Sequence, residues 1–137
     1  MGVLIDGIWH DEELPQETGS SGEFRRADSR FRDCITADGS SGFKAEPGRY
    51  HLYVAHGCPW AHRTLIYRAL NGLDGLISVA YAIPGLKKNG WTFEKHPRYP
   101  DCTPDTVNGF HYLHEAYPAV CSGLFPDLNL LLLSFAC

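Results

Sequence analysis

The chain has 137 residues and a net charge of −4, which is the size of a single domain. Hydrophobic residues make up 44% and charged residues 20%, an ordinary globular composition that argues against disorder throughout. The negative charge would repel a phosphate backbone, and no lysine and arginine cluster exceeds two residues, so we expect no nucleic-acid partner.

Residues 1–49 are predicted to form an irregular amino-terminal extension. They show no sustained helix or strand period, and they contain two turn-forming clusters, at 18–22 and 38–42. The first ten residues lack the basic and apolar regions of a secretory signal. We expect a solvated arm in which only the rings of Phe24 and Phe31 are buried.

A β-α-β unit is predicted from residue 50 onward. Residues 50–55 are rich in aromatic and β-branched side chains and read as a strand. Pro59 stands where a first helical turn accepts proline, and helical spacing of apolar residues continues to Leu70. A second β-prone run covers 76–83, so the two strands are expected to be parallel with a right-handed crossover.

A second helix is predicted to begin at Pro104, with Thr103 as its N-cap. Its apolar face would end at Tyr117, because Pro118 breaks the pattern. The apolar run near the end of the chain is far shorter than the ~20 residues of a membrane helix, so we expect no membrane association.

Cys58 is the candidate nucleophile, because it stands between the first predicted strand and its helix. The amide groups and the dipole at a helix start favour a thiolate, which is the reactive form of cysteine. We expect this sulfur to be ionised and accessible. A small buried cysteine without chemical function is the competing interpretation, and the Cys58-Pro59 pair at a strand-to-helix junction favours the nucleophile.

Ala61 occupies the position where a dithiol oxidoreductase carries its second cysteine. A mixed disulfide on Cys58 would therefore need an external thiol for release, which points to glutathione. A zinc site formed by His56, Cys58 and His62 is a weaker alternative, because no second ligand pair stands at zinc spacing. We expect no metal, and we expect His62 and Arg63 on the helix surface.

The other four cysteines are expected to have no catalytic role. Five cysteines without paired spacing indicate reduced thiols, and therefore a cytoplasmic protein.

Several motifs of this chain closely resemble the glutathionyl-hydroquinone reductases, the xi class of glutathione transferases. The resemblance covers residues 1 to about 117. It rests on the segments at 48–54 and 58–66, and on shorter matches in the same order at 4–9, 31–32, 35–39, 90–93 and 112–115.

The resemblance implies an α/β thioredoxin-like domain followed by an all-helical domain, in a dimeric enzyme. It implies that Cys58 attacks the sulfur of a glutathionylated hydroquinone and is then regenerated by a second glutathione, which is a co-substrate. It also assigns Trp91 and Pro59 to the glutathione site.

Residues 118–137 depart from the family pattern, which continues with a Val-Pro strand, a Glu-Ser pair and the helical domain. We therefore expect an incomplete thioredoxin-like domain at 50–117 and an atypical tail at 118–137, as a frameshifted or truncated reading frame would produce. An inactive fragment and a redox-sensing thiol module remain alternatives to an active enzyme.

Overall fold

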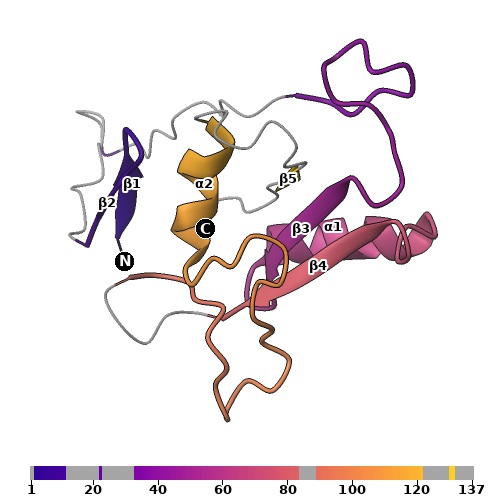
Figure 1. Cartoon of the computed structure of the whole chain (residues 1–137). Coiled ribbons are helices and arrows are strands. Elements are labelled where there is room, and N and C mark those ends of the chain that lie inside the picture. Colours follow the sequence, from indigo (N-terminus) through magenta and orange to yellow (C-terminus); the bar gives the residue numbers. More distant parts are fainter. Residues whose placement is uncertain (1, 12–21, 23–32, 84–88, 122–129, 132–137) are drawn as a thin grey trace.

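The computed structural model describes residues 2–11, 22, 33–83, 89–121 and 130–131 (Figure 1). The elements in this part of the chain are β1 (Val3–Ile5), β2 (Ile8–His10), β3 (Tyr50–Ala55), α1 (Pro59–Leu70), β4 (Ile77–Ala82), α2 (Leu113–Cys121) and β5 (Leu130–Leu131). They form one sheet of order β1-β2 and a second of order β4-β3-β5. The second sheet is the centre of a partial thioredoxin-like domain.

The β-α-β unit predicted from residue 50 onward is confirmed. The first strand and the helix have the predicted bounds, and the second strand is shorter by one residue at each end. The strands are parallel, and their register runs from Tyr50 opposite Ile77 to Ala55 opposite Ala82. The structure therefore brings the carboxyl ends of β3 and β4 to the same edge, beside the start of α1.

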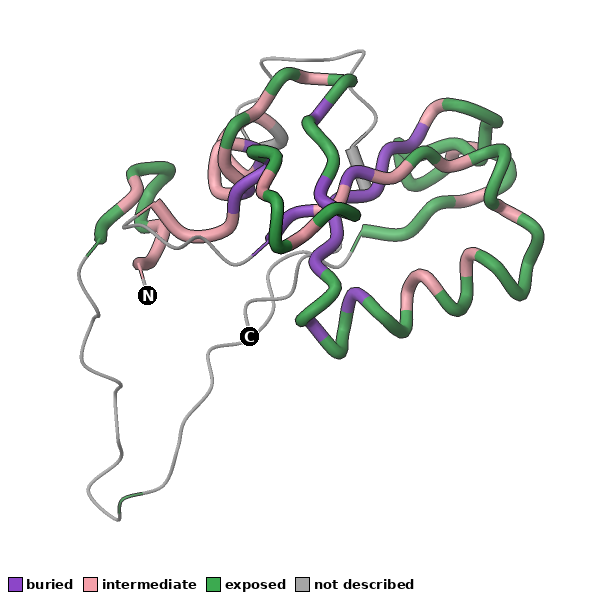
Figure 2. The backbone as a smooth tube through the Cα atoms, turned by 90° about the horizontal axis from the view of Figure 1, so that it is seen from below, coloured by how far each residue is buried: buried purple, intermediate pink, exposed green. Residues whose placement is uncertain are grey.

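Both faces of β3 are covered, and Figure 2 shows buried residues running through the middle of the described fold. Side chains alternate between the faces of a strand. Leu52 and Val54 are buried on the side of α1, where Leu65 packs on the core. Tyr53 lies on the other side, with its ring centroid 5.2 Å from that of Phe93. A strand buried on both faces reads as a continuous apolar run, which is why β3 could be located from sequence.

The prediction of a helix beginning at Pro104 is wrong, because α2 begins at Leu113. The Asp105 carboxylate accepts hydrogen bonds from three backbone N–H groups that follow it, those of Val107, Asn108 and Phe110. Such local bonds offer the backbone an alternative to the helix. Thr103 is consequently not an N-cap, and it bonds to β4 instead: its N–H donates to Tyr81 O and its Oγ1 accepts from Tyr81 N–H.

The helix α2 continues through Pro118 to Cys121, so the expectation that the pattern ends at this proline is also wrong. Proline within a helix removes one hydrogen bond and crowds the preceding turn, which usually breaks a helix. Here the packing of α2 outweighs that cost, since Leu113 and Ala116 are buried in the core.

The amino-terminal extension contains a hairpin, which corrects the expectation of an irregular segment. Asp6 and Gly7 both have positive φ, at 49° and 80°, as a tight hairpin turn between two short strands requires. Strands of three residues are too short for a periodicity to be recognised. Figure 1 shows the hairpin on the same side of the fold as α2. The two are joined through Trp9, whose ring stacks on His114 with a centroid separation of 4.4 Å. The rings of Phe24 and Phe31 lie outside the described residues.

The strand β5 comes from the segment predicted to be an atypical tail. Leu130 and Leu131 pair in parallel with His51 and Leu52, so two residues of that segment extend the central sheet. Within the described part of the chain, no helix is long and apolar enough to cross a membrane.

Candidate functional site around Cys58

Cys58 is the N-cap of α1, as the sequence predicted. Its backbone is extended, with φ −97° and ψ 115°, and Pro59 follows in the first helical turn. Its N–H donates to Ala55 O at 3.0 Å, and its carbonyl accepts the N–H of His62 at 3.1 Å. The cysteine is thus fixed on a tight turn between β3 and α1, where the first helical N–H groups lack intrahelical acceptors.

The structure buries Cys58, contrary to the expectation of an accessible sulfur. The residue is only 4% exposed and belongs to the apolar core cluster, as does Ala61 at 1% exposure. Its side chain makes no capping hydrogen bond to the helix. The sulfur-bearing residue therefore lies at a helix start and within an apolar surrounding at the same time.

Trp91 lies beside this turn, which brings together the residues assigned from the family resemblance. Its ring packs on the core cluster that contains Cys58, and the ring carbon Cη2 lies 4.0 Å from where a Cβ on Gly57 would be. The main chain around Trp91 is held on both sides. Its carbonyl accepts Leu113 N–H at 2.9 Å, and Thr92 exchanges two backbone hydrogen bonds of 3.0 Å with Ile83. Pro59 is exposed at the same helix start.

His56, which the sequence pattern suggested only as a zinc ligand, also lies at this site. Its exposed ring stacks on Tyr81 of β4, with a centroid separation of 4.6 Å and an interplanar angle of 8°. Among the described residues no group of three or more His, Cys, Asp or Glu side chains could hold a metal ion. His62 and Arg63 are exposed on α1, as expected, and the Arg63 guanidinium lies 4.6 Å from the centroid of the Trp60 ring.

The other cysteines with described side chains differ in environment. Cys34 is exposed, whereas Cys102 is buried, and neither forms a disulfide within the described part of the chain. The Cys102 thiol donates to Glu94 O at 3.2 Å, and burial raises its pKa. The thiol of Cys102 is therefore held in its protonated form as part of the core.

A buried polar network on the opposite face of β3 was not predicted. The Tyr53 hydroxyl donates to Asp105 Oδ2 at 2.7 Å and accepts from Asn108 Nδ2 at 2.7 Å. Burial raises the pKa of Tyr53, and its hydrogen bond to Asp105 acts in the same direction. Burial alone would raise the pKa of Asp105, but its hydrogen bonds from Tyr53 and three backbone amides lower it overall.

His51 is a neighbour of this network. It shares a hydrogen bond of 2.6 Å with Ser78 through Nδ1, and its ring meets Tyr53 edge-on with centroids 4.7 Å apart. Burial lowers the pKa of His51, although the Asp105 carboxylate opposes the effect. These groups stabilise the fold on the face away from α1, and no sequence motif marks them.

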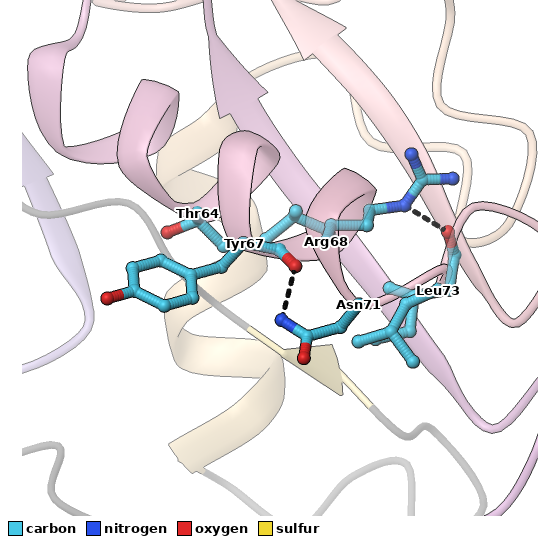
Figure 3. Close-up of a pocket in the computed structure, with 7 residues that line it drawn as sticks. Thr64, Tyr67, Arg68, Asn71 and Leu73 are labelled. Carbon is cyan, nitrogen blue, oxygen red and sulfur yellow. Dashed lines mark hydrogen bonds between the residues drawn. The ribbon is translucent and has the colours of Figure 1, made fainter.

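An apolar hollow of about 130 Å³ lies under the carboxyl-terminal half of α1 (Figure 3). Leu52 and Ile77 from the sheet form part of its wall, and the helix contributes Tyr67 and Arg68. The Arg68 Nε donates to Ile77 O at 2.8 Å. The hollow is at the opposite end of α1 from Cys58, so it is separate from the candidate site.

The chain is similar in sequence to proteins of known function, although no family model matches it. A glutathionyl-hydroquinone reductase of Escherichia coli (strain K12), YqjG, is 46% identical over 123 residues, which are 85% of this chain and 37% of that protein.

Comparison with solved structures finds similarity to the same group of proteins. A xi-class glutathione transferase from Natrialba magadii has a TM-score of 0.69 at 37% identity, covering 89% of this chain and 34% of its own. The glutathione-bound structure of Escherichia coli YqjG has a TM-score of 0.64 at 42% identity, covering 85% and 33%. The chain therefore spans about a third of the length of the relatives it matches.

Proposed function

Because this chain corresponds to the amino-terminal portion of the glutathionyl-hydroquinone reductase family, the xi class of glutathione transferases, we propose that it carries that family's thiol-transfer site with Cys58 as nucleophile. The Cys58 thiolate attacks the sulfur that joins glutathione to a hydroquinone ring. A Cys58–glutathione disulfide forms, the ring carbon keeps the electron pair of its broken bond to sulfur, and that carbon takes a proton from solvent.

A second glutathione completes the cycle. Its thiolate attacks the mixed disulfide, which yields glutathione disulfide and regenerates Cys58. In the net reaction, the ring carbon has been reduced, while the thioether sulfur of the conjugate and the thiol of the second glutathione have been oxidised to glutathione disulfide. Ala61 supports this external resolution, because no second thiol stands one helical turn from Cys58.

The observation that carries the proposal is the position of Cys58 as the N-cap of α1 at the carboxyl end of a buried parallel strand. Backbone amides at a helix start stabilise a thiolate at that point without any further charged side chain. In the proposed complex, Trp91 and Pro59 contact glutathione from either side of the turn that holds the sulfur. The related Escherichia coli protein YqjG has been solved with glutathione bound, which supports the same ligand here.

We take the boundaries of the proposed unit from the sequence pattern. Residues 50–117 form the partial thioredoxin-like unit, 1–49 are its amino-terminal extension, and 118–137 are an atypical tail. We place the protein in the cytoplasm, where glutathione keeps thiols reduced. The dimer belongs, in this proposal, to a protein with the length of its relatives.

Mass spectrometry of the intact 137-residue protein after mixing with a glutathionyl-hydroquinone tests the nucleophile. We expect one glutathione adduct on the parent chain and none on Cys58→Ser. Cys34→Ser is the matched control, because Cys34 is an exposed thiol outside the site, and it should still form the adduct. An adduct that persists in Cys58→Ser and disappears in Cys34→Ser would contradict the proposal.

A second candidate function is a redox-sensing thiol that is glutathionylated without multiple turnover. The 4% exposure of Cys58 favours it, because a buried thiol reacts slowly. Steady-state release of hydroquinone separates the candidates. Continuous turnover supports the reductase, whereas a single burst equal to the protein concentration supports the sensor.

A further inference from the structure

His56 and Tyr81 form a stacked pair, and His56 stands two residues before the proposed nucleophile. The two rings are 8° from parallel at a centroid separation of 4.6 Å, and His56 is exposed while Tyr81 is partly buried. Tyr81 is anchored through its main chain, whose N–H and carbonyl both bond to Thr103. An exposed ring backed by an anchored one loses little freedom when a ligand binds against it.

His56 belongs to the same short turn as the proposed nucleophile, and Trp91 lies near that turn as well. His56, Gly57 and Cys58 are consecutive, so the α-carbons of His56 and Cys58 are separated by two steps of about 3.8 Å at most. The Trp91 ring approaches the middle residue of the three, at 4.0 Å from the position of a Cβ on Gly57. The turn before α1 thus has two aromatic groups close to it, the His56–Tyr81 pair and Trp91.

The reaction chemistry requires an aromatic ring close to Cys58. In a glutathionyl-hydroquinone the sulfur under attack is bonded directly to a ring carbon. When that sulfur reaches Cys58, the hydroquinone ring lies within one bond of it. If Trp91 contacts the glutathione part, the ring needs a second surface near the same turn.

We propose that the exposed face of His56, supported from behind by Tyr81, is the surface on which the hydroquinone ring of the substrate stacks. The inference rests on the proposed function and adds a specificity-determining residue to it. Flat aromatic groups gain about 0.5–1.5 kcal/mol from such contacts, which corresponds to a rate effect of about two- to tenfold when the contact is made only by the aromatic donor.

A competing role for His56 is that of a positive charge that stabilises the Cys58 thiolate. The two roles give different patterns with two glutathione donors. A stacking surface affects only a donor that carries a ring. A charge on the thiolate changes the reaction with every donor, because it acts on the nucleophile itself.

The experiment measures the single-turnover rate of Cys58 glutathionylation in the full 137-residue chain, with a glutathionyl-hydroquinone and with glutathione disulfide as donors. We expect His56→Ala to slow the aromatic donor by about two- to tenfold and to change the disulfide rate by less than about twofold. His56→Phe keeps a stacking ring without a titratable group and should restore the aromatic rate. His62→Ala is the matched control, since it removes an exposed histidine of α1, and it should change neither rate.

Any other outcome would contradict the proposed role of His56. Equal slowing of both donors by His56→Ala, without rescue by His56→Phe, would assign His56 a charge role. Unchanged rates with both donors would remove His56 from the site while leaving Cys58 as nucleophile. A parent chain that accepts glutathione from neither donor would overturn the proposed function together with the stacking surface. Thermal melts of the variants show whether a loss of rate reflects a loss of fold.

Discussion

The Tyr53 hydroxyl donates a hydrogen bond of 2.7 Å to Asp105 Oδ2, and this bond joins residues 52 positions apart in the chain. Both residues are buried, at 0% and 7% exposure. The bond ties the centre of β3 to the turn that precedes α2. It therefore connects the strand leading to Cys58 with the segment that holds Trp91 through Leu113.

Replacing Asp105 should destabilise the fold. Asp105→Ala removes the acceptor of the buried Tyr53 hydroxyl and of three partly buried backbone amides, and a buried donor left without a partner costs about 1–3 kcal/mol. We expect the free energy of unfolding in urea to fall by about 3 kcal/mol or more, with no change for the exposed control Asp101→Ala beyond about 0.5 kcal/mol. Equal stability of the two variants would show that the network does not stabilise the fold.

The stability of the fold should fall as the pH is lowered below about 6.5, the ordinary pKa of histidine. Burial lowers the pKa of His51 in the folded state, although Asp105 opposes this, and Nε2 has no hydrogen-bond partner within the described structure. Between the lowered folded value and the unfolded one, only the unfolded chain takes up the proton. The free energy of unfolding then decreases by up to about 1.4 kcal/mol per pH unit.

His51→Phe should flatten this dependence at pH values below about 6.5, measured as urea midpoints at a series of pH values. The carboxylate of Asp105 does not interfere, because its lowered pKa means that its contribution is lost only below about pH 3.9. A slope that is identical in the parent and in His51→Phe would assign the pH dependence to other groups.

Trp91→Ala should have opposite effects on the exposure of the Cys58 thiol and on the binding of glutathione. The Trp91 ring packs on the cluster that contains Cys58, so its removal should open a path to the sulfur. We expect alkylation of Cys58 by iodoacetamide to become several-fold faster, while glutathionylation by glutathione disulfide becomes slower because the proposed binding surface is lost. A parallel increase of both rates would show that Trp91 only shields the thiol.

Pro118→Ala should stabilise α2. The proline lies within Leu113–Cys121 and lacks the N–H that a helix interior uses, at a cost of about 3 kcal/mol relative to alanine. Alanine keeps the Cβ, which in Pro118 lies 3.7 Å from where a Cβ on Gly7 of the hairpin would be. We expect the melting temperature to rise by several degrees. A lower melting temperature would mean that the pyrrolidine ring itself contributes to packing against the hairpin.

The sequence was informative where local chemistry decides the structure. The apolar run of β3, the proline that opens α1 and the asparagine and glycine that follow it gave these elements their bounds, and the strand-to-helix position of Cys58 followed from them. Apolar periodicity failed at Pro104, because the Asp105 carboxylate satisfies amides that a helix would otherwise use. Apolar periodicity also did not predict that Trp9 packs against His114, because that contact depends on tertiary structure alone.

In the candidate site, too, local features were predicted and tertiary contacts were not. Cys58 was identified from its neighbours in the chain, whereas the glutathione-binding roles proposed for Pro59 and Trp91 came from family resemblance. The stacking of His56 on Tyr81 could not be predicted, because it depends on the parallel register that places Val54 opposite Tyr81. The burial of Cys58 depends on residues from both sides of the sheet and has no local signal.

The spacing of the contacts around β3 implies an order of folding. His51 and Ser78 are 27 positions apart, whereas Tyr53 and Asp105 are 52 apart and the partners of β5 lie further still. Because the entropy lost in closing a loop grows with its length, β3, α1 and β4 should associate before the Asp105 turn and β5 add to them. The turn that carries Cys58 lies inside this first-formed unit, so Cys58 is positioned early during folding, before Trp91 packs against the cluster that contains it.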